Sequence, residues 1–324
     1  MRALVYTGPE TLEIRDVADP QAAEGDILLD VSLCGICGSD MHAYLGHDDR
    51  RPAPLILGHE AVGVASGGKR YAVNPLVTCG ESEACRDGRD NLCADRQIIS
   101  MPPREGAFAE KLAMPAGNLV ELPEHAEMAA AALTEPLACG WHAVRLAAEV
   151  SKRHLEETTC LAIGGGAIGL GAALALRAQG ARDVWLAETS PIRRALLKDV
   201  DGVRCFDPDC ETAPAPDIIV DGVGIAPTRA YASEIVKPGG VIAHIGLGSA
   251  EGGLDIRRMT LQEIAFFGTY TYAMSDFRET AQAIFDGRMG DLSWVKIMPL
   301  DAGPAAFSAL RKGEVANPKV LLAM

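Results

Sequence analysis

The chain has 324 residues, of which 48% are hydrophobic and 23% are charged, and its formal net charge is −14 at pH 7. This composition is typical of a globular protein, and the length suggests two domains. The negative charge argues against nucleic acid and anionic membrane surfaces as partners, because both require a basic face. The nine cysteines are an odd number, which argues against a disulfide framework and favours metal ligation or simple burial.

Residues 1 to about 125 predict a β-rich domain. They are rich in Gly and Pro and carry short apolar runs such as ALVY, DILLDVSL and AVGVA, which are typical of short strands joined by irregular loops. The N-terminus has neither a long apolar segment nor a small-residue cleavage site, so it does not resemble a signal peptide. We therefore expect a cytoplasmic protein.

From about residue 126 the chain is rich in Ala and Leu, and EMAAAALTEPLACGWHAVRLAAEV predicts helices interrupted by Pro136. Strand-like and helical segments then alternate, a pattern that indicates an α/β domain with a doubly wound parallel sheet over residues 126–272. Residues 158–176 hold no charge, but their glycines and strand-then-helix pattern favour a buried strand and helix over a membrane span. Residues 273–324 predict amphipathic helices and a last strand.

The segment GGGAIG, residues 164–169, fits the G-x-G-x-x-G pattern of dinucleotide-binding loops. An apolar strand precedes it, an Ala/Leu-rich helix follows it, and the next predicted strand ends at Glu188. This context favours a pyrophosphate at the helix N-terminus and adenosine ribose hydroxyls on the Glu188 carboxylate, over a glycine-rich turn without a ligand. The predicted cofactor-binding residues are Gly164, Gly166, Ala167, Ile168, Gly169, Glu188, Arg193 and Gly246.

The charge of Glu188 decides which dinucleotide we expect. A carboxylate repels a 2′-phosphate, so the sequence favours NAD over NADP. Arg193 and Arg194 follow closely, and either of them could soften this preference.

The β-rich part and its junction with the helical part also offer side chains of the types that bind zinc. GICGSD offers Cys37, GHE offers His59 and Glu60, and TEPLA offers Glu135. A catalytic zinc takes thiolate, imidazole or carboxylate ligands and keeps one position open for water or substrate. Cys37, His59 and one carboxylate would meet this requirement and balance the charge of the ion. Seen alone, the dipeptide in GHE would indicate only a turn with a solvated surface.

Taken together, GICGSD, GHE, a cysteine cluster that ends in NLC, GAFAE, TEPLA and GGGAIG resemble the zinc-dependent medium-chain alcohol dehydrogenases. The resemblance covers nearly the whole chain and is greatest to the polyol branch, the sorbitol, idonate and threonine dehydrogenase-like enzymes. It implies a GroES-like catalytic domain of residues 1–125, completed by about 273–324, and a Rossmann domain of residues 126–272. The site would lie between the two domains, and the protein would be a homodimer or homotetramer.

The resemblance also implies an activity and the groups that perform it. A hydride would pass between a secondary alcohol, such as a polyol, a sugar acid or a diol, and NAD. Cys37 and His59 would bind the catalytic zinc, and Glu60 and Glu135 would supply the carboxylate, one directly and the other through water. Which of the two glutamates touches the metal stays open.

Further roles are implied for the residues around Cys37. Asp40 resembles the carboxylate that orients the zinc-binding histidine. Ser39 resembles the hydroxyl that takes the alcohol proton, and His42 the histidine that passes this proton to solvent. Cys34 forms a C-x-x-C pair with Cys37, which could indicate a zinc knuckle or a redox motif, but we interpret it as a small buried residue.

The segment NPLVTCGESEACRDGRDNLC resembles the structural zinc lobe of the same family, which holds the metal with four cysteines. The cysteines present here are Cys79, Cys85 and Cys93. Ser82 stands at the second position, and a serine hydroxyl is a poor zinc ligand, although Glu81 or Glu83 could substitute. We therefore expect a lobe without metal, whose cysteines could form a partial or oxidised site.

Two alternatives to polyol oxidation remain. A threonine-type or simple alcohol dehydrogenase would carry the same motifs. A catalytically inactive homologue that only binds the cofactor would also keep the fold.

Overall fold

The computed structural model describes all 324 residues, and the chain divides into two compact units. Unit 1 comprises Met1–Glu135, Ala273–Phe285 and Ser293–Met324. Unit 2 comprises Pro136–Tyr272 and Asp286–Leu292. Both ends of the chain therefore belong to unit 1, and the C-terminal segment can contribute residues to any site there.

Unit 1 is built from short strands. The elements before residue 136 are β1 (Arg2–Gly8), β2 (Thr11–Asp16), β3 (Asp26–Gly35), α1 (Gly38–Tyr44), β4 (Leu55–Ile56), β5 (Glu60–Ala65), β6 (Arg70–Val73), β7 (Leu76–Val77), α2 (Glu83–Arg86), η1 (Asp90–Leu92), β8 (Gln97–Ile98), β9 (Lys111–Pro115), η2 (Ala116–Asn118), β10 (Leu119–Glu121) and α3 (Met128–Ala131). The returning segment adds α9 (Met274–Phe285), β17 (Val295–Pro299), η4 (Leu300–Ala302), α10 (Gly303–Arg311) and β18 (Lys319–Ala323).

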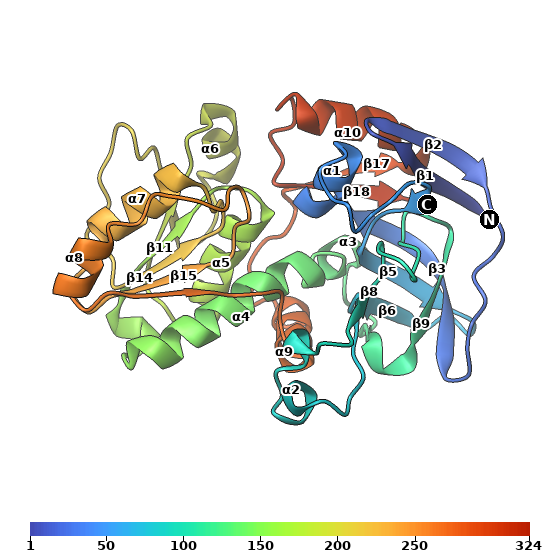
Figure 1. The fold of residues 1–324 in the computed structure, drawn as a ribbon, viewed down its shortest axis with the longest axis horizontal. Coiled ribbons are helices and arrows are strands. Elements are labelled where there is room, and N and C mark those ends of the chain that lie inside the picture. The colour runs from blue at the N-terminus through green and yellow to red at the C-terminus, as the bar shows by residue number, and fades with distance from the viewer. The chain divides into compact units, whose positions relative to one another are not determined.

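The main sheet of unit 1 has the strand order β10-β6-β5-β3-β18-β17, and β9 also pairs with β3. The C-terminal strands, red in Figure 1, thus lie beside β3, blue in the same figure. A second sheet has the order β2-β1-β4, and β7 pairs with β8 in a third. A shared apolar core includes Phe108 and Phe307, whose rings pack edge to face with centroids 5.9 Å apart. The predicted β-rich character of this part is confirmed.

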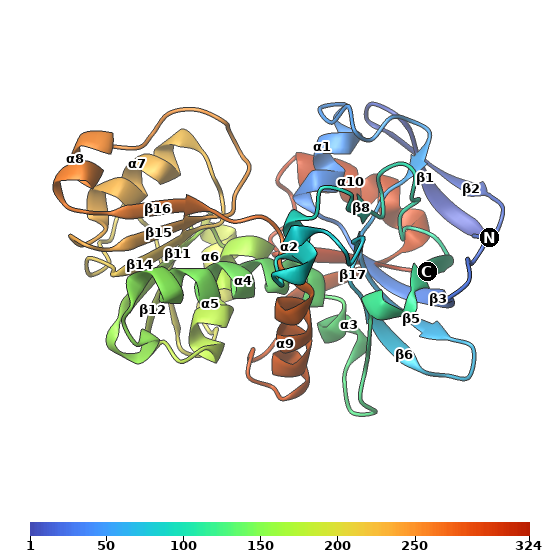
Figure 2. The same cartoon turned by 60° about the horizontal axis from the view of Figure 1, so that its bottom comes forward.

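Unit 2 contains a six-stranded sheet in the order β13-β12-β11-β14-β15-β16, and every strand pair in it is parallel. Its elements are β11 (Thr159–Ile163), α5 (Ala167–Ala178), β12 (Asp183–Ala187), α6 (Pro191–Leu197), β13 (Val203–Phe206), β14 (Ile218–Asp221), α7 (Ala226–Ile235), β15 (Val241–His244), α8 (Ile256–Leu261) and β16 (Ala265–Gly268), preceded by α4 (Thr134–Ser151) and η3 (Leu155–Glu157). Figure 2 shows α7 and α8 on one face of this sheet and α4 and α5 on the other. The predicted doubly wound parallel sheet is confirmed.

The helix break expected at Pro136 lies earlier in the chain. α3 ends at Ala131 and α4 begins at Thr134, so Pro136 stands within the first turn of α4 and does not interrupt it. A proline is tolerated there because the amide that it lacks would have no partner inside the helix. The Thr134 hydroxyl donates to the Ala131 carbonyl across the break, at 2.8 Å.

The uncharged stretch 158–176 forms β11 and most of α5, as the sequence indicated. None of the helices combines the length and the apolar character that a membrane-spanning segment requires.

Candidate metal centre and cofactor loop

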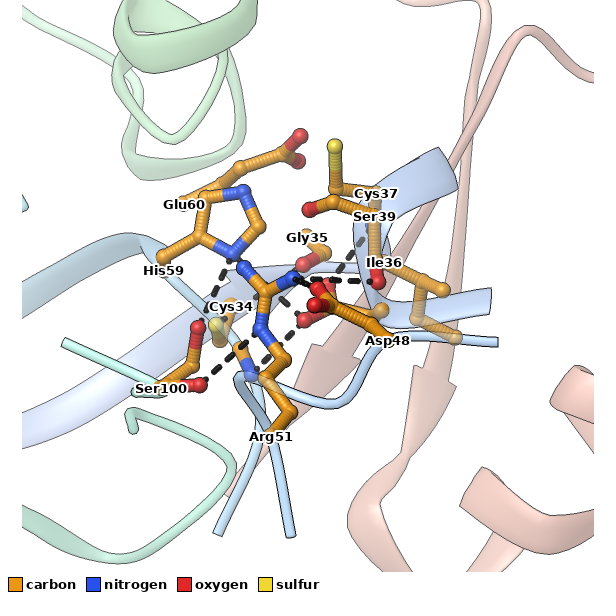
Figure 3. A network of polar contacts seen from close by, with 12 residues as sticks. Cys34, Gly35, Ile36, Cys37, Ser39, Asp48, Arg51, His59, Glu60 and Ser100 are labelled. Atoms are coloured by element: carbon orange, nitrogen blue, oxygen red, sulfur yellow. Dashed lines mark hydrogen bonds and ion pairs between the residues drawn. The ribbon is translucent and has the colours of Figure 1, made fainter. Parts of the chain in front are cut away.

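Three possible metal ligands meet in unit 1 where β3 ends and β5 begins. Cys37 caps the N-terminus of α1 directly after β3, and His59 precedes Glu60, the first residue of β5. Each of these residues offers one ligand atom, and the three atoms all lie within 4.8 Å of one another. Figure 3 shows the Cys37 sulfur, the Glu60 carboxylate and the His59 ring turned toward the same space. The antiparallel pairing of β3 with β5 brings these segments together, because Gly35 lies opposite Glu60.

The Asp40 carboxylate holds the two segments that carry these ligands in place. It is fully buried and accepts hydrogen bonds from the Cys37 amide at 2.9 Å and the Gly58 amide at 3.1 Å. Its Oδ1 also lies 3.4 Å from Nδ1 of His59. Burial alone would raise the pKa of Asp40, but the neighbouring His59 and Arg51 and the Cys37 amide hold it below its usual value. Asp40 therefore stays ionised and orients the imidazole.

The contacts of His59 leave one ring nitrogen for a metal. Besides Asp40, the Ser100 hydroxyl lies 3.5 Å from Nδ1, so Nε2 is the nitrogen that remains. Burial would lower the pKa of His59, but the charges of Asp40 and Cys37 raise it well above its usual value. A metal ion would compete with this proton for the same nitrogen.

Glu60 is buried in an ion pair that the sequence did not reveal. Its Oε1 lies 2.5 Å from Nζ of Lys319 at the start of β18, and both side chains are almost completely shielded from solvent. The Lys319 ammonium also donates to the Ile36 carbonyl at 3.0 Å. Burial disfavours the charged amine, but the negative charges of Glu60, Cys37 and Glu135 raise the pKa of Lys319. The one sequence feature that could have indicated a buried lysine is that Lys319 begins the otherwise apolar strand KVLLAM.

The second oxygen of Glu60 supports the assignment of a metal centre. Oε2 is buried and has no hydrogen-bond partner, which is costly for a carboxylate oxygen. It lies where a Cβ at Gly35 would collide with it, so the absence of a side chain at Gly35 makes room for this oxygen. A cation beside Cys37 and His59 would satisfy Oε2, and thiolate, imidazole and carboxylate are zinc ligands. The residues present therefore fit a zinc ion.

A second buried cation supports the loops around the centre. Arg51 is 5% exposed and donates from Nε to the Ser100 carbonyl at 3.0 Å. Its Nη1 contacts Asp48 at 2.6 Å and the Ser39 carbonyl at 3.5 Å (Figure 3). This guanidinium thus connects the segment that carries Ser39 with the one that carries Ser100. No sequence motif pointed to it.

The remaining predicted residues lie around this close set. Ser39 is half-buried and His42 is exposed, and both stand on α1 at the i,i+3 spacing that places side chains on one helix face. Glu135, in the first turn of α4, is buried and lies outside the close set, although its charge acts on Lys319. Cys34 is fully buried in the apolar core of unit 1 and is also outside the set.

The glycine-rich loop connects β11 to α5 in unit 2. Gly164 follows β11 with φ of +97°, a conformation that favours glycine, and Gly166 caps the N-terminus of α5. A side chain at Gly166 would meet no atom within 4 Å, so its backbone is open to a ligand. Ala167, Ile168 and Gly169 form the first turn of α5. The predicted Gly246 follows β15 and donates its amide to the Asp221 carbonyl at 3.0 Å.

Glu188, at the end of β12, is tied to this loop. Its Oε2 accepts from the Gly165 amide at 2.8 Å, and its Oε1 accepts from the Ser190 amide at 2.7 Å. Arg193 lies 3.2 Å from the same Oε2. Arg194 instead donates to the Glu188 carbonyl at 2.8 Å and pairs with Asp207 at 2.6 Å. Of the two arginines, only Arg193 is therefore placed to affect the Glu188 carboxylate.

The cysteine lobe holds three thiols and a capping hydroxyl. The sulfurs of Cys79, Cys85 and Cys93 all lie within 4.8 Å of one another. At the position of the missing cysteine, the Ser82 hydroxyl accepts from the Cys85 amide at 3.3 Å and caps α2. The lobe therefore presents three thiols rather than the four of a structural zinc site. Hydrogen bonds from Glu81, Cys93 and Ser82 lower the pKa of Cys79 to about 7.

Sequence models of two protein families match the chain. Residues 23–124 match the alcohol dehydrogenase GroES-like domain, and residues 167–286 match the zinc-binding dehydrogenase family. Sorbitol dehydrogenase of Bacillus subtilis (strain 168) is 30% identical over 298 residues, which cover 84% of this chain and 83% of the relative. L-idonate 5-dehydrogenase of Vitis vinifera is 30% identical over 295 residues, which cover 82% and 78%. The chain belongs to the zinc-dependent medium-chain alcohol dehydrogenases, in their polyol branch.

The fold of this dehydrogenase agrees with that assignment. The crystal structure of galactitol-1-phosphate dehydrogenase from Escherichia coli superposes with a TM-score of 0.89 and covers 100% of both chains, at 22% identity. The predicted combination of a GroES-like part and a Rossmann part is confirmed. The dehydrogenase is thus an oxidoreductase of the alcohol and polyol type.

The buried pair between Lys319 and Glu60 leads to a stability prediction. Lys319→Met keeps the length of the side chain but leaves the Glu60 carboxylate buried without a counter-charge, which costs about 3–5 kcal/mol. In chelator-treated protein, we expect the free energy of unfolding in urea to fall by this amount.

The matched control is Lys69→Met, because Lys69 pairs with Glu121 at 2.8 Å where both side chains are exposed. Its loss should cost less than about 1 kcal/mol. Equal losses in the two variants would show that the Lys319 pair is not the buried interaction described here.

Proposed function

We propose that the dehydrogenase oxidises a secondary alcohol of a polyol, sugar acid or diol, with zinc at Cys37 and His59 and with NAD as the hydride acceptor. The single observation that carries this proposal is the convergence of Cys37, His59 and Glu60, whose ligand atoms lie within 4.8 Å of one another and whose Glu60 carboxylate keeps a buried oxygen without a partner. A zinc ion held there by Cys37 and His59 would supply Lewis-acid chemistry to an alcohol hydroxyl, and a bound NAD would supply the hydride acceptor.

The side chains around the centre orient its ligands and move the proton. Asp40 and Ser100 hold Nδ1 of His59 and so direct Nε2 to the metal side. Ser39 is the hydroxyl that takes the alcohol proton, and the exposed His42 on the same helix passes it to solvent.

Glu60 is the carboxylate nearest to the proposed metal. Because Lys319 already holds Oε1, only Oε2 is free to serve the metal. We propose that Glu60 approaches the metal through this oxygen and that Glu135 acts from further away, through its charge on Lys319.

The substrate class follows from the relatives and from the charge at the site. Relatives named sorbitol dehydrogenase and L-idonate 5-dehydrogenase support a secondary alcohol that carries further hydroxyl groups. The charged groups Glu60, Lys319 and Glu135 make the surroundings of the centre polar, which favours such a substrate over a purely apolar alcohol.

The preference for NAD is supported by Glu188. Its carboxylate is fixed beside the glycine loop by the Gly165 amide, where a negative charge would repel a 2′-phosphate. Arg193 neutralises part of this charge and is the residue that would allow some use of NADP.

We also propose that the dehydrogenase is a homo-oligomer that works in the cytoplasm. The edge strand β16 of the parallel sheet has one unpaired side, and the exposed apolar side chains of Leu247 and Ile256 line a cavity together with Phe266 of this strand. Nine cysteines, all of them free thiols, suit a reducing compartment.

Removal of Cys37 tests the proposed centre. Cys37→Ala should lower NAD-dependent turnover of polyols and sugar acids, followed by NADH absorbance, by more than about 100-fold, because a direct metal ligand is lost. Bound zinc measured by elemental analysis should fall by about one ion per chain, while NADH binding followed by fluorescence persists.

Cys210→Ala, an exposed cysteine of unit 2, is the control and should keep both zinc and turnover. Unchanged turnover in Cys37→Ala would contradict the assignment. Wild-type protein that binds NADH and zinc but turns over no alcohol would instead indicate an inactive homologue.

A second substitution tests the cofactor preference. Glu188→Ser removes charged hydrogen bonds to the ribose, which are worth roughly 1.5–3 kcal/mol, so the ratio of kcat/KM for NAD over NADP should fall about 10–100-fold. Glu211→Ser, at an exposed position of the same unit, should leave the ratio unchanged. A ratio that stays at the wild-type value in Glu188→Ser would show that another group selects the cofactor.

A further inference from the structure

The cysteine lobe places an exposed sulfur beside a buried thiol. Cys79 is exposed, whereas Cys93 is fully shielded from solvent. The Cys93 thiol donates to the Cys79 sulfur at a distance of 3.4 Å. Cys85 lies 4.0 Å from Cys79, further away than Cys93. Of the two other thiols, that of Cys93 is therefore the nearer to the Cys79 sulfur.

Several donors converge on the Cys79 sulfur. The Ser82 amide donates to it at 3.3 Å, and the Glu81 amide and the Ser82 hydroxyl also contribute hydrogen bonds. Together with the Cys93 thiol, these groups stabilise a negative sulfur, and the thiolate is the reactive form of cysteine. An exposed, stabilised thiolate next to a second cysteine is the arrangement found in redox-sensitive sites.

Ser82 takes the place of a fourth cysteine and favours a reactive Cys79. Its hydroxyl oxygen accepts from the Cys85 amide, and its proton is directed to the Cys79 sulfur. Where a fourth thiolate would complete a metal site, the lobe therefore has a hydroxyl that stabilises Cys79. Three thiols without a fourth ligand leave Cys79 free to react.

We propose that Cys79 and Cys93 form a reversible redox pair that reacts with hydroperoxides. The Cys79 thiolate attacks one peroxide oxygen, the O–O bond breaks, and Cys79 becomes a sulfenic acid while the departing oxygen takes up a proton. The Cys93 sulfur then forms a bond to Cys79, and the sulfenic hydroxyl leaves with the Cys93 proton as water. The two sulfurs lose two electrons, and the hydroperoxide gains them.

Closure of the disulfide needs only a small movement. The two sulfurs must approach from 3.4 Å to about 2.05 Å. A cellular dithiol restores the two thiols by thiol–disulfide exchange. The dithiol gives up two electrons and becomes a disulfide itself. The reaction uses no residue of the proposed zinc centre, so it can be tested independently of the proposed function.

The experiment uses the full-length purified protein, because the arginines of the lobe allow the linkage to be read directly. Trypsin cleaves after Arg70, Arg86, Arg89 and Arg96, which places Cys79 and Cys85 on one peptide and Cys93 on another. The reduced protein is treated with hydrogen peroxide, its free thiols are alkylated, and the digest is analysed by mass spectrometry. We expect the two peptides to be joined with the loss of two thiols per chain, and dithiothreitol to separate them.

Two variants identify the cysteines involved. In Cys85→Ser the link should persist, because the pair is intact. In Cys93→Ser the link should be lost and the Cys79 sulfenic acid should be trapped by dimedone. In the wild type, Cys79 should be oxidised roughly tenfold or more faster than the exposed Cys210.

Other results would overturn the proposal. These are unlinked peptides after peroxide treatment of the wild type, or loss of the link in Cys85→Ser. The proposal would also be overturned if Cys37→Ala protein kept a zinc ion in the lobe and its Cys79 did not react with peroxide.

Discussion

A buried ammonium–carboxylate pair joins the last strand of this dehydrogenase to its metal centre. Lys319 and Glu60 lie 259 positions apart in the chain, yet their charges meet at 2.5 Å in a region without solvent. A carboxylate in that place requires a counter-charge, because an isolated buried charge is expensive. The C-terminal strand β18 is therefore part of the centre as well as part of the sheet. Without Lys319, the Glu60 carboxylate would lose the protein counter-charge that offsets the cost of its burial.

The pair also gives the two oxygens of the Glu60 carboxylate different surroundings. One oxygen is held by Lys319 and the other is left without a partner among protein groups. Asp40, by contrast, uses its carboxylate entirely to hold backbone amides and the His59 ring. Two buried acids within one centre thus serve different ends. One fixes the geometry of the ligands, and the other remains available to a cation.

Motifs in which the interacting groups are close in sequence were predicted well. The glycine loop, the end of the next strand at Glu188 and the parallel sheet around them all follow from local patterns of glycine, apolar residues and charge. The prediction of a helix break at Pro136 was wrong. A proline is tolerated in the first turn of a helix, and the sequence did not show that α4 begins at Thr134. Which of Arg193 and Arg194 contacts the Glu188 carboxylate also depended on the side-chain packing of α6.

By itself the sequence determined the family and the type of fold, and it supplied the candidate residues for zinc and a dinucleotide, because these depend on residue type and short spacing. Only the tertiary structure decided that Glu60 rather than Glu135 stands in the close set, and that Lys319 and Arg51 support it. It also decided that the cysteine closest in space to Cys79 is Cys93, and not Cys85, which is nearer in sequence. The physical reason is the same in each case. Burial and pairing between distant segments arise from the packing of strands and loops, and no local pattern of residues encodes them.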